Sequence, residues 1–522
     1  MASVRNILFI MCDQLRADYL SCYGHPRLAT PNIDRLAAMG TRFTRAYIQG
    51  SVCGPSRMSF YTGRYVMSHG ATWNFVPLPA GERTLGDYLR VAGLRTAVVG
   101  KTHAASDVEG ITRLTLNPET GAGLLLAEAG FEPYARHDGI IPDSAIEKHG
   151  GVYNAFLKTK GYAARNPWHD YANAGAAADG SIASGWNMRN AGLSALVDEA
   201  DSETAWTTDR AMDFIREQGE QPWCLHLSYI KPHWPYIAAA PYHAAFGADD
   251  CVAPVRAQHQ RDDVHPVYRA FRHHPEGEAF SRDEVRRTVI PAYMGLVKQI
   301  DDHIGRLLAF LEDAGRMNDT MIVFTSDHGD YLGDHWLGEK EMLFEQCVRV
   351  PLIIVDPSDQ AARNVVSDAL VEAIDIVPTF LDALGQSIPD HIIEGHSLLP
   401  LLHGKAAPAR DAVFCELDYA FYTARHELGV GVDNARAVMV RTQHWKLVHY
   451  DGFPPQLYDM TNDPLELNDR GADAGLTNVR RELYDLLFNW MRRRRNRITL
   501  RSAQVVGRSQ PKSDIGVVIG QW

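Results

Sequence analysis

Cysteine is scarce in this chain: seven occur among 522 residues, and no two form a Cys-x-x-Cys pair. Because seven is odd, at least one thiol has no partner within the chain. Small secreted domains carry cysteines in regular, even-numbered sets, so the pattern excludes a disulfide framework. The scattered cysteines predict a reducing compartment, and we expect a cytoplasmic protein.

Long apolar runs are also missing. The run at residues 7–12 is six residues long and ends at Asp13. This is too short for a membrane span or a signal peptide, and no small-residue cleavage site follows it. No other segment reaches spanning length, so we expect no association with a membrane.

The chain has no surplus of positive charge. It contains 52 Lys and Arg residues against 64 Asp and Glu, a net charge of −12. This balance argues against general nucleic-acid binding and fits a protein that concentrates a few cations locally. The basic run at residues 492–495 is typical of a solvated helix end. The length allows one large domain and a smaller one.

What the chain does contain is a repeated order of buried strand, polar residue and helix. Continuous apolar runs, typical of strands buried on both faces, occupy residues 7–12, 96–99, 223–230 and 320–326. Polar residues follow them, at the carboxyl ends where open α/β sheets place ligands. The alternation predicts an α/β fold with a doubly wound, mainly parallel sheet.

Helices are predicted between these strands. The clearest covers residues 31–39, because Thr30, Pro31 and Gly40 suit its cap, first turn and end. The longest covers residues 282–314, and we expect an interruption near Pro291. Further helices are expected at residues 85–91 and 203–217, and a short strand at residues 42–48 leads toward Cys53.

Two regions have weaker patterns. Residues 104–200 are rich in Gly, Ala and Asn, and we interpret them as insertions with short helices that overhang the site and shape substrate choice. Residues 241–275 hold several histidines without ligand spacing, which favours a solvated loop over a metal site.

The pattern changes near residue 410, so we predict a catalytic α/β domain at residues 1–410 and a smaller α+β domain at residues 411–495. The smaller domain is expected to hold short antiparallel strands at residues 413–417, 437–441, 444–449 and 456–459, then a helix at residues 479–495. Residues 496–522 have no strong core pattern. Such a tail is either mobile or clasped by a neighbouring subunit, and we expect the latter, in a homodimer or homotetramer.

The stretch from Cys53 to Arg57 reads Cys-Gly-Pro-Ser-Arg. Gly54 and Pro55 indicate a turn that opens a helix, where the helix dipole favours anionic chemistry. Arg57 adds a forked set of donors suited to phosphate or sulfate oxygens. Taken alone, the stretch is equally consistent with a buried cysteine and a surface arginine.

These five residues resemble the Cys-x-Pro-Ser-Arg signature of the type I sulfatases. The resemblance implies an alkaline-phosphatase-like fold and the oxidation of Cys53 to formylglycine, an aldehyde that is hydrated at rest. It also implies a formylglycine-generating enzyme as a maturation partner. A chance match of five residues needs support from the rest of the chain, and residues 13–340 contain it.

Asp13 and Asp327-His328 follow two predicted buried strands, with Gln14 beside Asp13. Unpaired carboxylates placed together would repel, so they favour a shared divalent cation; separate acids at strand ends are the alternative. Their positions are similar to the metal ligands of the alkaline phosphatase superfamily, with residue 53 as a further ligand. Gln14 and His328 resemble the phosphonate monoester hydrolase branch. An all-oxygen set suits Ca²⁺ and an imidazole favours Mn²⁺, so the metal stays open.

The resemblance implies further catalytic residues. Their local motifs are similar to those of sulfatases, and the residues are Lys101 and His103 in Gly-Lys-Thr-His, His233 in Lys-Pro-His, and Lys340 in Gly-Glu-Lys-Glu. Lys101 and His103 favour a sulfatase over a phosphonate hydrolase, in which uncharged hydroxyl residues are usual there. Asn74 is similar to a substrate-binding asparagine of the phosphonate hydrolase branch.

We therefore predict hydrolysis of sulfate monoesters of the arylsulfatase kind, with one divalent metal and formylglycine 53. The resemblance implies that Arg57, Lys101 and Lys340 hold the sulfuryl oxygens, that His233 with Lys340 assists the leaving group, and that His103 accepts a proton. Two alternatives stay open. One is a phosphonate monoester hydrolase or phosphodiesterase with the same site; the other is an unmodified, non-catalytic protein that binds a metal or an anion.

Overall fold

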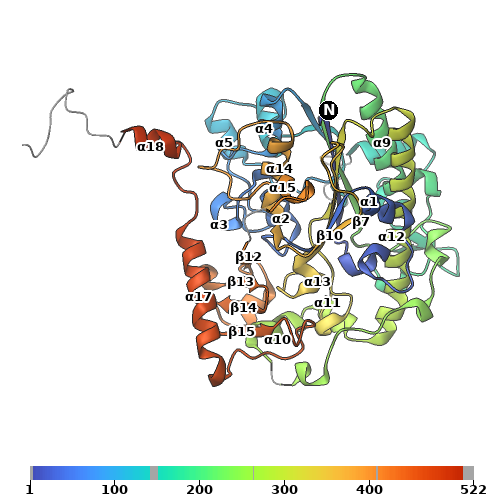
Figure 1. Ribbon diagram of the computed structural model, residues 1–522. Coiled ribbons are helices and arrows are strands. Elements are labelled where there is room, and N and C mark those ends of the chain that lie inside the picture. Colours follow the sequence, from blue (N-terminus) through green and yellow to red (C-terminus); the bar gives the residue numbers. More distant parts are fainter. Residues whose placement is uncertain (1–3, 141–150, 263, 407–409, 509–522) are drawn as a thin grey trace, which may run out of the picture.

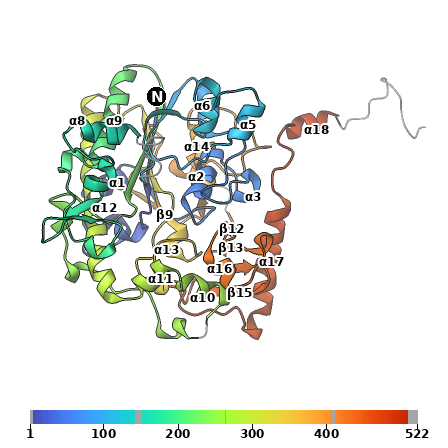
Figure 2. The ribbon, with the colours of Figure 1, turned by 180° about the vertical axis from the view of Figure 1, so that it is seen from behind.

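The computed structural model describes residues 4–140, 151–262, 264–406 and 410–508. Its main sheet has nine strands in the order β10-β2-β9-β8-β1-β7-β3-β4, with β11 beside β2. Helices cover both faces of this sheet (Figures 1 and 2). The strands are β1 (Asn6–Asp13), β2 (Thr41–Tyr47), β3 (Arg95–Gly100), β4 (Glu132–Arg136), β7 (Trp223–Pro232), β8 (Thr320–Ser326), β9 (Arg349–Val355), β10 (Val365–Ser367) and β11 (Val371–Glu372).

Strand β1 lies in the middle of the sheet, parallel to β7 on one side and to β8 on the other. Its side chains alternate between two hydrophobic cores. Ile7, Phe9 and Met11 pack into one core, and Leu8, Ile10 and Cys12 pack into the other. Both faces are buried, which explains the unbroken apolar run and confirms the predicted doubly wound sheet.

The predicted helices are confirmed with small shifts at their ends. They are α1 (Pro31–Met39), α4 (Leu85–Val91), α9 (Glu203–Gln218) and α12 (Asp283–Asp313). The predicted interruption near Pro291 is wrong, because α12 runs through it for 31 residues. Burial of Ile290 and Ala292 on either side offsets a proline cost of about 3 kcal/mol in a helix interior.

The interpretation of residues 104–200 as insertions was incomplete. They contain β4, which pairs in parallel with β3 and extends the main sheet. As an edge strand with only one buried residue, β4 lacks the apolar run that marks the central strands. The other elements there are α5 (Val108–Arg113), α6 (Gly121–Ala127), α8 (Gly151–Thr159) and the hairpin of β5 (Ala174–Ala176) and β6 (Ile182–Ser184).

Residues 241–275 are more ordered than a solvated loop. Residues Pro266–Arg272 form α10, whose Val267, Tyr268 and Phe271 are buried. His265 at its start has a hydrogen bond from Nε2 to the carbonyl oxygen of Pro454. This region therefore packs on the C-terminal part of the chain. Further α-helices of the described residues are α2 (Cys53–Thr62), α3 (Val66–His69), α11 (Pro275–Phe280), α13 (Glu345–Val348), α14 (Ile376–Ala383), α15 (Leu399–Leu402) and α16 (Thr423–Glu427).

The C-terminal part has the predicted antiparallel sheet, in the order β12-β13-β14-β15. Its strands are β12 (Ala412–Asp418), β13 (Arg436–Thr442), β14 (Trp445–Tyr450) and β15 (Phe453–Asp459), and α17 (Thr477–Arg492) packs against them. The basic run that follows is not wholly solvated. Arg494 lies over the ring of Tyr65, 4.1 Å from its centroid, and forms an ion pair with Glu394.

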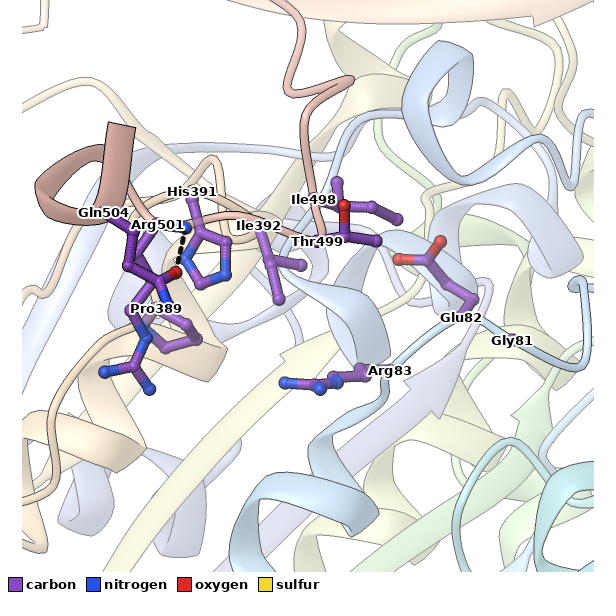
Figure 3. A pocket seen from close by; sticks show the side chains of 10 residues that line it. All are labelled: Gly81, Glu82, Arg83, Pro389, His391, Ile392, Ile498, Thr499, Arg501 and Gln504. Atoms are coloured by element: carbon purple, nitrogen blue, oxygen red, sulfur yellow. Dashed lines mark hydrogen bonds between the residues drawn. The ribbon is translucent and has the colours of Figure 1, made fainter. Parts of the chain in front are cut away.

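The tail begins against the body of its own chain and then leads away to α18 (Ser502–Arg508), which projects outward in Figures 1 and 2. A pocket of about 390 Å³ separates its first part from the body (Figure 3). Ile498, Thr499 and Arg501 face residues 81–83 and 389–392 across it. Residues 509–522 lie outside the described part, so clasping by a neighbouring subunit stays a prediction. No helix in the described ranges has the length and apolarity that a bilayer span requires.

Candidate active site

The site forms where the carboxyl ends of β1 and β8 meet the first residue of α2. Asp13 ends β1, Asp327 and His328 follow β8, and Cys53 begins α2. One ligand atom from each of these four buried residues lies within 4.8 Å of the other three. The parallel pairing of β1 and β8 places the two aspartates together, as the strand pattern predicted.

The Cys53 side chain lies at the centre of this group. Its Sγ is 3.1 Å from His328 Nε2, 3.8 Å from Asp13 Oδ1 and 4.0 Å from Lys101 Nζ. Burial opposes ionisation, but Lys101, Lys340 and His328 together hold the pKa of the Cys53 thiol well below its ordinary value. An anion at this position is therefore stabilised by the surrounding charges.

His328 is oriented by its own backbone. Nδ1 donates a hydrogen bond to the carbonyl oxygen of Gly329 at 2.8 Å, so this nitrogen carries a proton. Nε2 therefore faces the site, 3.7 Å from an oxygen of each aspartate. Burial lowers the pKa of His328, but Asp327 and Cys53 raise it to about 9. An imidazole fixed in this way beside two carboxylates is a donor set that fits a divalent cation.

Arg57 is fully buried and its donors all face the protein. Nε donates to Asp327 Oδ2 at 2.7 Å, and Nη2 donates to Asp13 Oδ2 at 3.2 Å. Nη1 donates to the carbonyl oxygen of Lys101 and to the hydroxyl of Ser228. The interpretation as a surface arginine is thus excluded. The guanidinium holds Oδ2 of both aspartates, and Oδ1 of Asp13 faces Cys53.

Two lysines bring positive charge to the site from different parts of the chain. Lys101, after β3, has its Nζ 2.5 Å from Asp13 Oδ2. Lys340 Nζ donates to His233 Nε2 at 3.3 Å and to Gln14 Oε1 at 3.1 Å. Both ammonium groups are buried, so little water screens their charge.

His233 is a hydrogen-bond acceptor toward the site. Its Nδ1 donates to the carbonyl oxygen of Trp234 at 2.7 Å, which leaves Nε2 to accept from Lys340. Burial, Lys340 and Lys101 lower the pKa of His233 to about 4, against the opposite effect of Asp13. Lys340 is therefore the proton-carrying member of this pair.

His103 follows Lys101 on a strained stretch of backbone. Its φ of 51° lies in the left-handed region, which non-glycine residues rarely adopt. A hydrogen bond from His103 is one of the contacts that lower the pKa of Cys53, after the larger effects of burial and the nearby charges. Its Nδ1 is buried and has no hydrogen-bond partner among the described residues. Such an orphaned atom fits a position where a bound molecule supplies the partner.

Comparison with known protein families supports a hydrolytic active site at these residues. Residues 5–386 match the family model described as "Sulfatase", and residues 333–493 match that of "N-sulphoglucosamine sulphohydrolase, C-terminal". The chain belongs to the sulfatase family. It is therefore a hydrolase of the alkaline phosphatase fold, which sets aside the non-catalytic binding protein as an interpretation.

Relatives within and around this family cover nearly the whole chain. The multifunctional alkaline phosphatase superfamily protein PehA of Trinickia caryophylli is 30% identical, over 93% of this chain and 95% of its own length. An arylsulfatase of Clostridium perfringens is 27% identical, over 88% and 89%. The structure of the phosphonate monoester hydrolase SpPMH from Silicibacter pomeroyi has a TM-score of 0.83 and 28% identity, over 94% and 96%.

In this sulfatase-family chain, Gln14 is held from several sides. Its Nε2 donates to Asp330 Oδ2 at 2.7 Å and to the hydroxyl of Tyr236 at 3.1 Å, while its N–H donates to Asp327 Oδ1. Sequence analysis missed Asp330 and Tyr236, which position the Gln14 amide. The spacing Asp-His-Gly-Asp after β8 was the available signal for Asp330.

Asn74 lies beside the first turn of α2. Its Oδ1 accepts a hydrogen bond from the backbone N–H of Gly54 at 2.7 Å. A Cβ on Gly54 would lie 2.9 Å from the Cα of Asn74, so only glycine permits this approach. Asn74 is thus adjacent to residue 53, and its substrate-binding role stays a prediction.

Proposed function

We propose that this protein hydrolyses sulfate monoesters, using a formylglycine derived from Cys53 and one divalent metal ion. The observation that supports the proposal most directly is the convergence of Asp13, Asp327 and His328 on the Cys53 side chain. Two buried lysines stand beside this group. Together they provide a cation site, a nucleophile position and positive charge for an oxyanion among buried side chains.

We propose Asp13, Gln14, Asp327 and His328 as the ligands of the metal, together with residue 53. Three carboxylate or amide side chains and one imidazole suit Mn²⁺ as well as Ca²⁺, so the proposal includes either ion. A bound cation would supply Lewis acidity, and a hydroxyl of the hydrated aldehyde would be the nucleophile once its proton has passed to Asp327. Arg57 contributes by holding Oδ2 of Asp13 and of Asp327 in place through hydrogen bonds.

The side chains around residue 53 have separate tasks in this proposal. Lys101 and Lys340 neutralise the sulfuryl oxygens in a space that excludes water. As the new sulfur–oxygen bond forms and the ester sulfur–oxygen bond breaks, Lys340 Nζ gives a proton to the departing oxygen. His233 Nε2 accepts a hydrogen bond from Lys340 and so directs that proton. When the carbon–oxygen bond to the sulfate group breaks and the aldehyde is restored, the proton of the second hydroxyl passes to His103, whose side chain hydrogen-bonds to residue 53.

The proposal includes a formylglycine-generating enzyme as the maturation partner, a small-molecule sulfate ester as substrate and a cytoplasmic location. All seven cysteines are free of disulfides, which is compatible with a reducing compartment. We also propose a homodimer or homotetramer in which the tail contacts a neighbouring subunit. The outward course of α18 supports this arrangement (Figure 1).

A second candidate is hydrolysis of phosphonate monoesters or phosphodiesters at the same site. Gln14 and His328 favour it, as does the similarity to SpPMH. These substrates also carry one negative charge beside a leaving group. Lys101 and His103 favour sulfate esters, which remain our main proposal.

Two measurements test the proposal together. Mass spectrometry of the peptide that contains residue 53 should show an oxo group where the gene encodes a thiol. The modified protein should hydrolyse 4-nitrophenyl sulfate with a higher kcat/KM than bis(4-nitrophenyl) phosphate or phenyl phenylphosphonate. The reverse order would favour the second candidate, and full activity with an unmodified thiol at residue 53 would contradict both.

A further inference from the structure

Lys231, near the end of β7, is a buried lysine that takes no part in the proposed chemistry. Its Nζ donates hydrogen bonds to the carbonyl oxygen of Pro235 and to Asn173 Oδ1, both at 2.9 Å. The same nitrogen lies 3.6 Å from Glu203 Oε2, in an ion pair whose two side chains are buried. These acceptors belong to the protein and surround the N–H donors of the ammonium group, so Lys231 holds other parts of the chain rather than a substrate.

The contacts of Lys231 close the loop that carries His233. Lys231 precedes His233 and Pro235 follows it, so the ammonium group joins the two ends of the loop of residues 231–235. The carbonyl oxygen of Pro235 also accepts from the N–H of Ile237, and the N–H of His233 donates to the carbonyl oxygen of Ile230. A side chain bonded across so short a loop restricts the directions in which His233 can point.

Glu203, the first residue of α9, connects this loop with more distant segments. Its Oε1 accepts a hydrogen bond from Trp168 Nε1 at 2.7 Å and lies 2.8 Å from His137 Nε2. Its Oε2 accepts from Asn173 Nδ2 at 3.3 Å. Burial raises the pKa of Glu203, but Lys231 and His137 bring it down to about 2. Burial lowers the pKa of Lys231, which Glu203 opposes. A charged carboxylate, held from several sides, therefore faces Lys231.

Stability of the fold is a weak reason for such a pair. Burying two charges carries a desolvation cost, and apolar side chains of similar size often leave a fold at least as stable. Apolar side chains cannot provide a directed bond to the carbonyl oxygen of Pro235. What the pair adds is thus the position of the loop, from which His233 Nε2 accepts a hydrogen bond from Lys340 Nζ at 3.3 Å.

We propose that Lys231 and Glu203 are positioning residues for the departure of the leaving group. Lys231 fixes the loop of residues 231–235 and Glu203 fixes Lys231, so that His233 Nε2 stays within hydrogen-bond distance of Lys340. This inference rests on the proposed function and adds two residues to its leaving-group step. It also gives Trp168 and Asn173, within the weakly patterned residues 104–200, a supporting role at this pair.

The test measures how strongly the rate depends on the leaving group. Lys231→Met removes the donors at nearly constant length, and Lys231→Arg keeps the charge and the donors. For each variant, kcat/KM is measured with 4-nitrophenyl sulfate and with phenyl sulfate, whose leaving group has the higher pKa. We expect Lys231→Met to lose about tenfold on phenyl sulfate and about threefold or less on 4-nitrophenyl sulfate, because a misplaced His233 impairs protonation of the departing oxygen. Lys231→Arg should retain most of both values.

Two further variants separate positioning from folding. Lys231→Met/Glu203→Gln removes both charges together, so that no buried charge is left unpaired, and should show the same pattern as Lys231→Met. Lys446 and Glu466 form a buried pair in the C-terminal part, 2.7 Å apart, and provide the matched control. Lys446→Met/Glu466→Gln should lower the melting temperature and leave the ratio of the two kcat/KM values unchanged.

Equal losses on the two esters in Lys231→Met would overturn the inference, because Lys231 would then support only the fold. In the Lys340→Ala background, Lys231→Met should cause no further loss on phenyl sulfate, and a full additional loss would also overturn it.

A crystal structure of Lys231→Met gives a measurement that needs no activity. We expect His233 Nε2 to lie beyond hydrogen-bond distance of Lys340 Nζ, and an unchanged distance would overturn the inference. Failure of formylglycine-bearing wild-type protein on both esters would contradict the proposed function instead, and the crystallographic comparison would still decide whether Lys231 positions His233.

Discussion

Arg57 Nε lies 2.7 Å from Asp327 Oδ2, in an ion pair that no solvent reaches. The same guanidinium also contacts Asp13, so one residue of the Cys-Gly-Pro-Ser-Arg stretch holds two proposed metal ligands. It binds Oδ2 of each aspartate, whereas the contact of Asp13 with Cys53 is through Oδ1. Arg57 therefore positions the carboxylates of the two proposed metal ligands through these hydrogen bonds.

Replacement of Arg57 by lysine should weaken metal binding. Lysine keeps the positive charge but cannot donate to both carboxylates in a planar fork. Loss of such a supporting partner typically costs 10–100-fold in metal affinity or activity, and we expect about that loss here. Dissociation constants from competition with a metal indicator measure it.

Arg64→Lys is the matched control for this change. Arg64 is also buried, and its Nη1 donates to both carboxylate oxygens of Glu82, outside the site. Its replacement should lower the melting temperature and leave metal affinity unchanged. Equal metal affinity in Arg57→Lys and wild type would contradict the positioning role.

His328→Asn should change which metal supports activity. The substitution replaces an imidazole nitrogen with an amide oxygen. The donor set becomes harder, so the affinity for Ca²⁺ rises relative to the affinity for Mn²⁺. We expect the ratio of activities with Ca²⁺ and Mn²⁺ to rise at least tenfold. Metal-stripped protein reloaded with each ion provides the measurement. His403→Gln, which removes an imidazole paired with Asp356, serves as control and should leave the ratio unchanged.

Lys340→Ala should make the rate more sensitive to the leaving group. If Lys340 supplies the proton, its loss costs little for 4-nitrophenol and about 10²–10⁴-fold for phenols of high pKa. A series of substituted phenyl sulfates gives the slope of log kcat/KM against leaving-group pKa. The slope should steepen in Lys340→Ala. A parallel line, lower by the same factor for every phenol, would assign Lys340 to oxyanion binding alone.

The buried His69 should make the fold sensitive to acid. Burial and, to a smaller degree, Arg64 lower its pKa to about 3, and Nε2 shares a hydrogen bond with Ser59. Because the folded-state pKa lies below the unfolded value of about 6.5, the unfolded chain binds more protons between these values. The stabilising contribution is therefore complete above pH 6.5 and is lost as the pH falls toward 3.

His69→Gln should lose less stability than wild type on acidification. Between pH 7.5 and pH 5 the wild type should lose about 2 kcal/mol more than the variant. Urea unfolding at the two pH values measures this difference. The exposed His426 provides the control, since His426→Gln should lose as much stability between the two pH values as wild type. Parallel losses in His69→Gln and wild type would show that His69 is not the acid-sensitive group.

Local sequence was sufficient to predict the framework of the site. The apolar runs before Asp13 and Asp327 marked two strands buried on both faces, and such strands lie inside a parallel sheet. Their carboxyl ends share one edge, so the pattern favoured a meeting of the two aspartates, and the parallel pairing of β1 with β8 decides this over separate acids. The edge strand β4 and the continuity of α12 through Pro291 did not follow, because packing against distant segments decides both.

By itself the sequence determined the buried central strands β1, β3, β7 and β8, most helix ends and the motif around Cys53, since these depend on neighbours a few residues away. Only the tertiary structure decided that Arg57 faces the ligands, that Asp330 holds Gln14, and that Trp73 stacks on Phe421. Each of those contacts joins segments far apart in the chain. The physical reason is that the choice among possible hydrogen-bond and ring partners depends on the packing of the whole fold.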